Sequence, residues 1–387
     1  MPAIASASSL FHIAPSDVAA GLPLSAGAGF CMLCSYYYLQ PLSDALALKV
    51  GLAQTPYITV ASMALIAIAN PVYAAAVRAL PVPRVLPAVY SVLAGVLLAF
   101  SACFAISPDG LALCFAFAVF TGIFSLFLTT TFWARMASLH TKPEAKRVYG
   151  IIAAGAQVGQ LCASASARFL YGALHQQILL FSTALLAASV QLITMRGARG
   201  LLPPLAQADP PSAAAATTAT TASTAVEEDS HIPRCCNRCF GGLRILMSTP
   251  LLRAISLHTL LMTFLVSGIW YERAAAVSAA FETDTDRYAF FATLNLIVGG
   301  LTLGMQLFCF SHLLSRVGFH GAMVCEPLIV AVGLVINAIS PGLLSIAVLD
   351  GGRKVSHSLL TSLDATWHAL LTPLPLTPRV RLCTTPS

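Results

Sequence analysis

Long apolar runs separated by short polar segments make up most of this sequence. A helix needs about 20 apolar residues to cross the hydrocarbon core of a bilayer. The runs that approach this length predict helices near 18–41, 55–77, 85–106, 111–134, 148–173, 177–195, 251–271, 288–311, 319–340 and 342–372. The pattern therefore predicts an all-α polytopic membrane protein with about ten transmembrane helices, six before a central gap and four after it.

The central gap has a different composition from the rest of the chain. Residues 196–250 are rich in Ala, Thr and Pro and carry an acidic group at Glu227–Asp229. Such low-complexity sequence cannot bury enough apolar surface to form a core. We therefore predict a six-helix bundle over 1–195, a flexible linker over 196–250 and a partial bundle over 251–387.

Composition excludes the water-soluble classes. The chain is 57% hydrophobic and 9% charged, with a mean hydropathy of +0.81, whereas soluble domains are about 25% charged. The net charge of +6 comes from basic residues scattered between apolar runs, which is not a nucleic-acid-binding pattern. Most of these residues fall on one side if the N-terminus is cytosolic, and basic loops favour the cytosol. We expect the N-terminus, the linker and the C-terminus to be cytosolic.

No sequence motif indicates an enzyme or a resident cofactor. The chain has no phosphate-binding loop, dinucleotide fingerprint, helical metalloprotease motif or nucleophile elbow. The cysteines of Cys235-Cys-Asn-Arg-Cys239 match no standard zinc spacing. Reduced thiols or reversible palmitoylation are the expected states there. We predict no catalytic activity, no cofactor and no metal site.

Polar side chains inside the apolar runs are candidates for a solute site. Such groups are costly at membrane depth unless they face the protein interior or a water-filled cavity. The first cluster, Tyr36–Asp44, closes the first run and predicts either a cavity lining or an aromatic belt at the membrane interface. At most one or two of its three tyrosines could face a solute, because successive helical residues point about 100° apart.

The last apolar run contains a second cluster. Asp350, Arg353, Lys354 and His357 follow the spacing i, i+3, i+4, i+7 and so share one helix face. This face predicts either a cavity wall whose cations bind phosphate or a cytosolic or interfacial helix. Asp364 continues the polar pattern of this run.

Two other runs supply weaker candidates. Small residues at 155, 159, 163 and 167 predict a face for close helix packing. Arg168, near the end of that run, is either a snorkelling residue or an anion contact. The run that ends at Tyr271-Glu-Arg273 predicts either a charged rim or part of the site, with Arg273 at the outer end of the helix. The candidate solute contacts are Tyr37, Gln40, Asp44, Gln157, Arg168, Tyr271, Glu272, Arg353, Lys354 and Asp364.

The two groups of runs share an arrangement of polar positions. Tyr38-Leu-Gln40 ends the first run, and Trp270-Tyr-Glu-Arg273 ends the first run after the linker. This correspondence favours two related halves about an axis along the membrane normal, as in major facilitator transporters.

Two motifs resemble the ATP/ADP antiporter family, the nucleotide-exchange transporters of bacteria and plastids. Tyr36-Tyr-Tyr-Leu-Gln-Pro-Leu-Ser-Asp44 and its continuation to Gly51 resemble the end of the family's first helix. Phe132-Trp-Ala-Arg-Met-Ala-Ser-Leu139 and Glu144-Ala-Lys-Arg-Val-Tyr-Gly150 resemble the exit from its fourth helix and the start of its fifth. The resemblance implies a major-facilitator-like fold, alternating access and exchange of nucleotides or other phosphorylated solutes. The chain departs from it by lacking the last two helices and by its long linker.

Three functions stay open at the level of the sequence. The first is exchange of a small anionic solute such as a nucleotide across the bilayer. The second is an ion-coupled carrier of another organic solute, in which Asp44 or Asp364 is protonated. The third is a non-transporting membrane scaffold or sensor.

Overall fold

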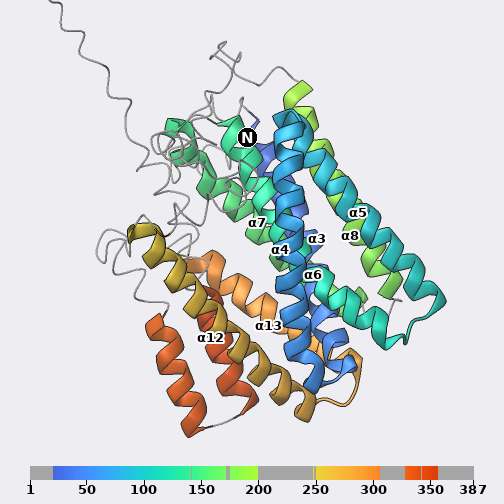
Figure 1. The fold of residues 1–387 in the computed structure, drawn as a ribbon, viewed down its shortest axis with the longest axis vertical. Helices are drawn as coiled ribbons and strands as arrows, with labels where there is room; N and C mark the ends of the chain where they lie inside the picture. The colour runs from blue at the N-terminus through green and yellow to red at the C-terminus, as the bar shows by residue number, and fades with distance from the viewer. Residues whose placement is uncertain are drawn as a thin grey trace, which may run out of the picture.

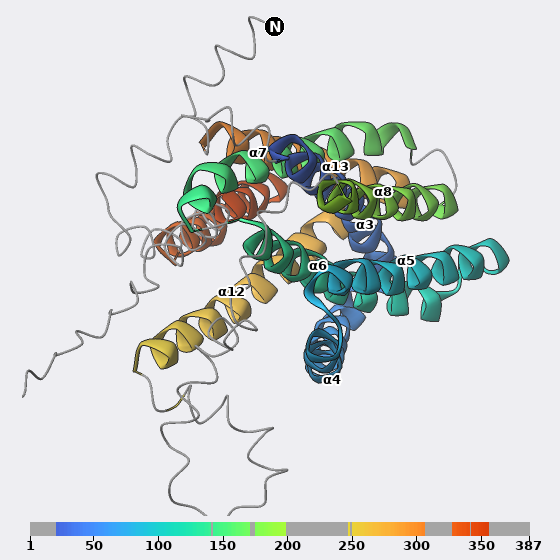
Figure 2. The same ribbon diagram turned by 90° about the horizontal axis from the view of Figure 1, so that it is seen from above.

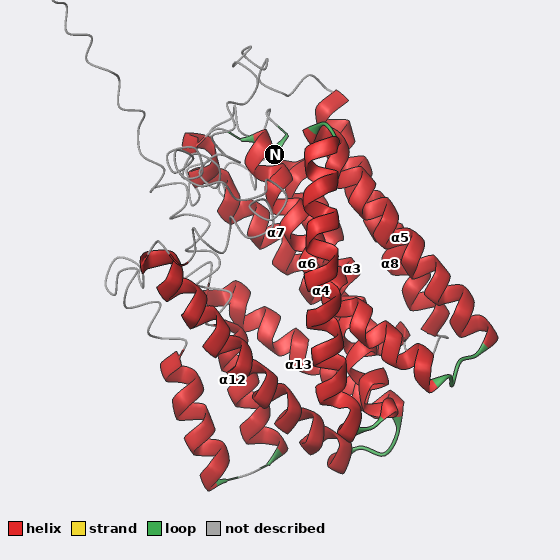
Figure 3. Ribbon diagram, viewed as in Figure 1, coloured by secondary structure: helices red, strands yellow, loops and turns green. Residues whose placement is uncertain are grey.

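The computed structural model describes residues 21–140, 142–170, 175–198, 247, 250–305, 327–340 and 342–355. These residues are nearly all helical and include no strand (Figure 3), which confirms the all-helical prediction for this part of the chain. The helices are α3 (Leu22–Val50), α4 (Thr55–Ala79), α5 (Val82–Ile106), α6 (Leu111–Leu139), α7 (Lys142–Leu170), α8 (His175–Ala198), α12 (Pro250–Ala280) and α13 (Asp284–Gly304). Two further helical segments cover 327–339 and 343–355.

Six segments are long and apolar enough to cross a membrane: Leu52–Ala79, Val82–Ile106, Leu111–Leu139, Val148–Ala167, Gln177–Arg196 and Ser256–Ala280. A chain with six such helices is a multi-pass membrane protein. The described helices match ten predicted runs in order, but α3, α13 and the two short segments are not among these six. The count of ten spans and the major-facilitator architecture therefore stay predictions.

Helix α3 lies at the centre of the bundle and packs against α6, α7 and α8 (Figure 1). On the outer side of α3, α5 packs between α8 and α6, and α4 packs along α6. Seen from above, α4 and α12 project from the bundle as separate arms (Figure 2). Helix α13 lies against both α7 and α3, so the part of the chain after the linker contacts the part before it.

The first helix is longer than its apolar run predicts. We expected it to end near residue 41, but α3 continues through Pro41 to Val50. Proline removes one backbone hydrogen bond and crowds the preceding turn, yet neighbouring helices make this tolerable within a membrane bundle. The Tyr36–Asp44 cluster therefore lies in the interior of α3 and not at a helix end.

The predicted packing face of α7 is confirmed. A Cβ atom added at Gly159 would lie 2.2 Å from the carbonyl oxygen of Phe30, and one at Gly155 would lie 3.0 Å from that of Ala26. Because glycine has no side chain, the backbones of α3 and α7 approach closely at these two points. Further along the same face, the side chains at 163 and 167 are fully buried alanines.

Helix α12 also extends past its predicted end. We expected it to stop near residue 271, but it reaches Ala280. Arg273 is therefore inside the helix, and its placement at the helix end is wrong. After a short turn, the Thr283 hydroxyl accepts a hydrogen bond from the Asp286 backbone N–H at 3.1 Å and caps α13.

The linker predicted over 196–250 lies almost entirely outside the described residues. Only its first three residues, at the end of α8, and residues 247 and 250 are described. The boundaries proposed at residues 195 and 250 therefore stay predictions.

Candidate functional site

A cavity of about 300 Å³ lies between α3, α4, α6, α12 and the segment 343–355. Small and hydroxyl side chains from α4 and α6 form one side of it. Charged and amide side chains from α3, α12 and 343–355 form the other. Its lining is Tyr36, Gln40, Ser43, Asp44, Ala47, Ile58, Thr59, Ser62, Ala118, Thr121, Gly122, Val266, Trp270, Arg273, Asp350, Arg353 and Lys354.

Asp350 is the centre of a cluster of buried charges in this cavity. Its carboxylate accepts hydrogen bonds from Arg273 Nη1 at 2.7 Å and from Arg353 Nη2 at 3.1 Å, and Lys354 Nζ lies 3.1 Å away. The side chain of Asp350 is only 4% exposed. The predicted shared face of 350, 353 and 354 is therefore confirmed, and it faces the protein interior.

Arg273 joins this cluster to α3. Its Nη2 donates to Asp44 Oδ2 at 3.2 Å, while Trp270 Nε1 donates to Asp44 Oδ1 at 3.3 Å. The guanidinium group also lies over the ring of Phe291, 5.1 Å from its centroid, which adds a cation–π contact. Asp44 and Arg273 therefore link the central helix to the part of the chain after the linker.

A chain of amide side chains runs along the cavity wall. Lys354 Nζ donates to Asn295 Oδ1 at 3.3 Å, and Asn295 Nδ2 donates to Gln40 Oε1 at 3.2 Å. Gln160 Nε2 donates to the backbone oxygen of Asn295 at 3.3 Å. These bonds connect α3, α7, α13 and 343–355 at one point.

Contacts between the two parts of the chain continue toward the carboxyl end of α3. There, Lys49 Nζ lies 2.5 Å from Asp109 Oδ1 and 3.8 Å from Asp284 Oδ2. A buried apolar cluster consists of Leu48, Ala274, Val277 and Phe291. Side chains from before and after the linker therefore pack together at this end of α3.

The charged side chains of the cavity do not balance. Among the described lining residues, Arg273, Arg353 and Lys354 face the carboxylates of Asp44 and Asp350, so this ionised set carries one excess positive charge. Burying charges costs several kcal/mol per ion unless partners compensate, and an ion pair often stabilises a fold no more than apolar residues would. An uneven set of this kind suits a site whose missing negative charge comes from a ligand.

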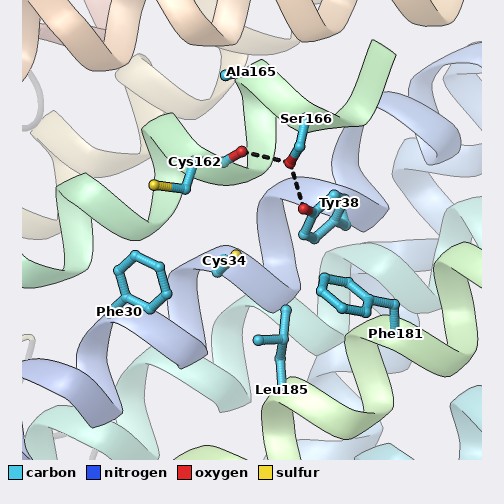
Figure 4. Close-up of a pocket in the computed structure, with 8 residues that line it drawn as sticks. All are labelled: Phe30, Cys34, Tyr38, Cys162, Ala165, Ser166, Phe181 and Leu185. Atoms are coloured by element: carbon cyan, nitrogen blue, oxygen red, sulfur yellow. Dashed lines mark hydrogen bonds between the residues drawn. The ribbon is translucent and has the colours of Figure 1, made fainter. Parts of the chain in front are cut away.

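A second pocket, of about 510 Å³, lies between α3, α7 and α8 (Figure 4). It is lined mainly by apolar side chains and two cysteines. Its polar atoms bond to one another: Tyr38 and Ser166 form a hydroxyl–hydroxyl hydrogen bond, and Ser166 also donates to the Cys162 backbone oxygen at 2.6 Å. None of the described residues that line this pocket is charged, so this lining does not suit an anion.

The structure brings four of the predicted site residues together at the charged cavity: Gln40, Asp44, Arg353 and Lys354. Tyr37, Gln157, Tyr271 and Glu272 do not line it. Tyr271 is 40% exposed, and Glu272 is exposed beside it. Tyr37 and Gln157 are half-buried elsewhere in the bundle; the side chain of Arg168 and all of Asp364 lie outside the described part of the chain.

Sequence reasoning did not select three residues that the cavity depends on. Arg273 was placed at the outer end of its helix, and Asp350 was noted on the shared face but was not chosen as a contact. Asn295 was passed over, although it is the one amide in the apolar run that forms most of α13. An isolated polar residue at membrane depth is itself a signal of a polar partner.

Comparison with known proteins does not assign this chain to a family. The chain matches no protein-family model, and it has no significant sequence match among curated proteins. Among the described residues, no group of three His, Cys, Asp or Glu side chains could hold a metal ion. The resemblance to nucleotide exchangers is therefore a hypothesis that depends on the two motifs, and the cavity must be interpreted from its own chemistry.

Proposed function

We propose that this chain is a membrane carrier that exchanges small phosphorylated anions, nucleotides among them, by alternating access. The observation that supports the proposal is the excess positive charge in the cavity, where Arg273, Arg353 and Lys354 surround Asp350. Arginine and lysine are the side chains that bind phosphate, arginine through paired donors and lysine as a point charge.

The cluster has donor capacity for an incoming anion. The Nε atom of Arg273 is buried and has no hydrogen-bond acceptor among the residues that the structure describes. Asp350 accepts from two arginines and a lysine at once. A phosphoryl oxygen could take over part of that coordination, so Asp350 would hold the cations in position while the site is empty.

The size of the cavity favours the smaller members of this class. At about 300 Å³, it lies at the lower end of the range of about 300–1,000 Å³ for ligand pockets. A monophosphate or inorganic phosphate suits this volume better than a nucleoside triphosphate does. Transport of a larger nucleotide would need a conformation in which the cavity is wider.

Opening of the cavity would involve contacts between the two parts of the chain. The Asp44–Arg273 pair and the apolar cluster of Leu48, Ala274, Val277 and Phe291 contain residues from before and after the linker. Separation of these residues would expose the cavity toward the carboxyl end of α3. In alternating access, two parts of a carrier move about a central site in this way.

The direct test is counterflow in proteoliposomes that contain the purified full chain. Uptake of labelled AMP, ADP, ATP or phosphate is measured with and without the unlabelled anion inside. We expect uptake that requires an internal anion and that is absent from protein-free liposomes. Protein correctly inserted in the membrane that takes up none of these four anions would contradict the proposal.

A proton-coupled carrier is a second candidate, and Asp44 is the observation that favours it. Its side chain is 12% exposed, and a buried carboxylate in a membrane protein can act in a proton relay. Uptake driven by a pH gradient, without an internal anion, and lost in Asp44→Asn, would support this function in place of exchange.

A further inference from the structure

Asn295 has a fixed orientation that the charges around it impose. Its side chain is 2% exposed, so both ends of its amide need hydrogen-bond partners within the protein. One end faces Lys354 Nζ at 3.3 Å, and the other faces Gln40 at 3.2 Å. An ammonium group has only donors, so the oxygen of Asn295 must face Lys354 and its nitrogen must face Gln40.

The orientation of Gln40 follows from that of Asn295. Because Asn295 presents N–H groups to it, Gln40 must direct its carbonyl oxygen toward Asn295. Its own NH₂ group is then left for another acceptor. No hydrogen bond to this nitrogen occurs among the described residues, and Gln40 lines the charged cavity. Lys354 therefore determines, through one intervening amide, which end of Gln40 is available to a ligand.

We propose that Gln40 is a specificity-determining residue that donates a hydrogen bond to the transported anion, and that Asn295 is its positioning residue. This inference rests on the proposed function and assigns a role within the same site. The carrier would recognise one phosphoryl group through Lys354, Arg353 and the Gln40 amide together. A ligand that presents hydrogen-bond donors to these three groups would be disfavoured, because the three groups are themselves donors.

The position of Asn295 suits this role. Gln160 holds its backbone oxygen from α7 at 3.3 Å, and Gly299, one turn further along α13, packs so closely that an added Cβ would lie 2.9 Å from Gln160 Nε2. Helix α13 is therefore held against α7 at the residue that orients Gln40. Because Asn295 is itself held in place, it keeps the NH₂ donor of Gln40 oriented before the ligand binds.

The test measures anion binding by the purified full chain in detergent, apart from transport. The readout is the concentration of AMP or inorganic phosphate that gives half of the maximal rise in melting temperature. Gln40→Met keeps the length of the side chain and removes the donor. We expect at least a tenfold rise in the half-maximal concentration for Gln40→Met, since a hydrogen bond to a charged group is lost. We expect a rise of about threefold or more for Asn295→Leu.

A double variant separates positioning from a general structural role. If Asn295 acts through Gln40, Asn295→Leu adds little to the effect of Gln40→Met in the same chain. A full additional loss in the double variant would overturn the positioning role. If Asn295→Leu does not fold, Asn295→Ser replaces it in the same cycle.

Two outcomes distinguish this inference from the proposed function. If neither anion stabilises the unmodified chain and counterflow is also absent, the proposed function and the role of Gln40 are both contradicted. If the anions stabilise the unmodified chain and Gln40→Met equally well, the carrier function stands and the role of Gln40 is overturned.

Discussion

The carboxylate of Asp44 lies 3.2 Å from Nη2 of Arg273, although the two residues are 229 positions apart in the chain. Asp44 belongs to the central helix α3, and Arg273 belongs to α12. Both side chains are largely buried, at 12% and 3% exposed. The pair is thus both part of the cavity wall and a direct contact between the two parts of the chain.

We predict that Arg273→Ala strongly destabilises the protein. The substitution leaves Asp44 without its arginine and deprives Asp350 of its closest cation. Breaking a buried ion pair by removing one partner costs about 3–5 kcal/mol. Unfolding in detergent should show a melting temperature well below that of the unmodified chain.

Arg287→Ala is the matched control for this change. Arg287 pairs with Asp284 at 3.3 Å at the start of α13, where the Asp284 side chain is 30% exposed, against 4% for Asp350. A pair with this much solvent access contributes about 0–1 kcal/mol. Equal losses of stability in the two variants would mean that burial does not govern the Arg273 contacts.

We predict that replacing Arg353 and Lys354 together by Ala abolishes anion exchange while the protein still reaches the membrane. Charged hydrogen bonds are worth about 1.5–3 kcal/mol each, so the loss of two should lower the exchange rate about a hundredfold or more. The comparison is Arg78→Ala with Arg84→Ala, which removes two positive charges from exposed positions on α4 and α5. Wild-type exchange in the first double variant would exclude both residues from the site.

We predict that Gly159→Ala destabilises the bundle. The new methyl group would lie 2.2 Å from the Phe30 carbonyl oxygen, and a backbone atom cannot move aside as a flexible side chain can. Overpacking of this kind costs about 1–3 kcal/mol. On the same helix, a Cβ at Gly150 would meet no atom within 4 Å. Gly150→Ala should therefore melt at the same temperature as the unmodified chain or slightly above it, and a similar loss in both variants would contradict close α3–α7 packing.

We predict that the two ends of α5 lie on opposite sides of the membrane. The helix spans Val82–Ile106, and its 25 residues are long and apolar enough to cross. An epitope tag inserted after Leu80, between Arg78 and Arg84, should be cytosolic by the positive-inside rule, and one after Ser107 should not. Protease protection in sealed membranes measures this, and equal protection of the two tags would show that α5 does not span.

The helices were the predictable part of this structure, because a run of apolar residues long enough to cross a bilayer is a local signal. The cluster of Asp350, Arg353 and Lys354 was predictable for the same reason, since i+3 and i+4 neighbours share a face whatever the rest of the chain does. The partners of that cluster were not. Arg273 reaches Asp350 from 77 positions away, and no local pattern specifies which distant helix supplies a counterion.

The positions at which the helices end could not be predicted from the sequence either. Polar residues such as Gln40 and Arg273 interrupt apolar runs, and for that reason they were interpreted as marking the ends of helices. In the structure their helices continue to Val50 and Ala280, because neighbouring helices provide the hydrogen bonds that a lipid environment would not. Polar residues in a membrane helix therefore indicate which neighbours the helix packs against and do not by themselves mark where it ends.

The uneven charge of the cavity has an electrical consequence for a carrier. With three cations and two carboxylates, the empty site would carry one positive charge through the membrane field, whereas a site loaded with a singly charged anion would be neutral. Each elementary charge that crosses the full field is worth about 2.3 kcal/mol per 100 mV. The membrane potential would therefore change the rate at which the empty carrier returns. It would leave a one-for-one exchange of monoanions unaffected, so the rate of an obligatory exchanger would not depend on the membrane potential.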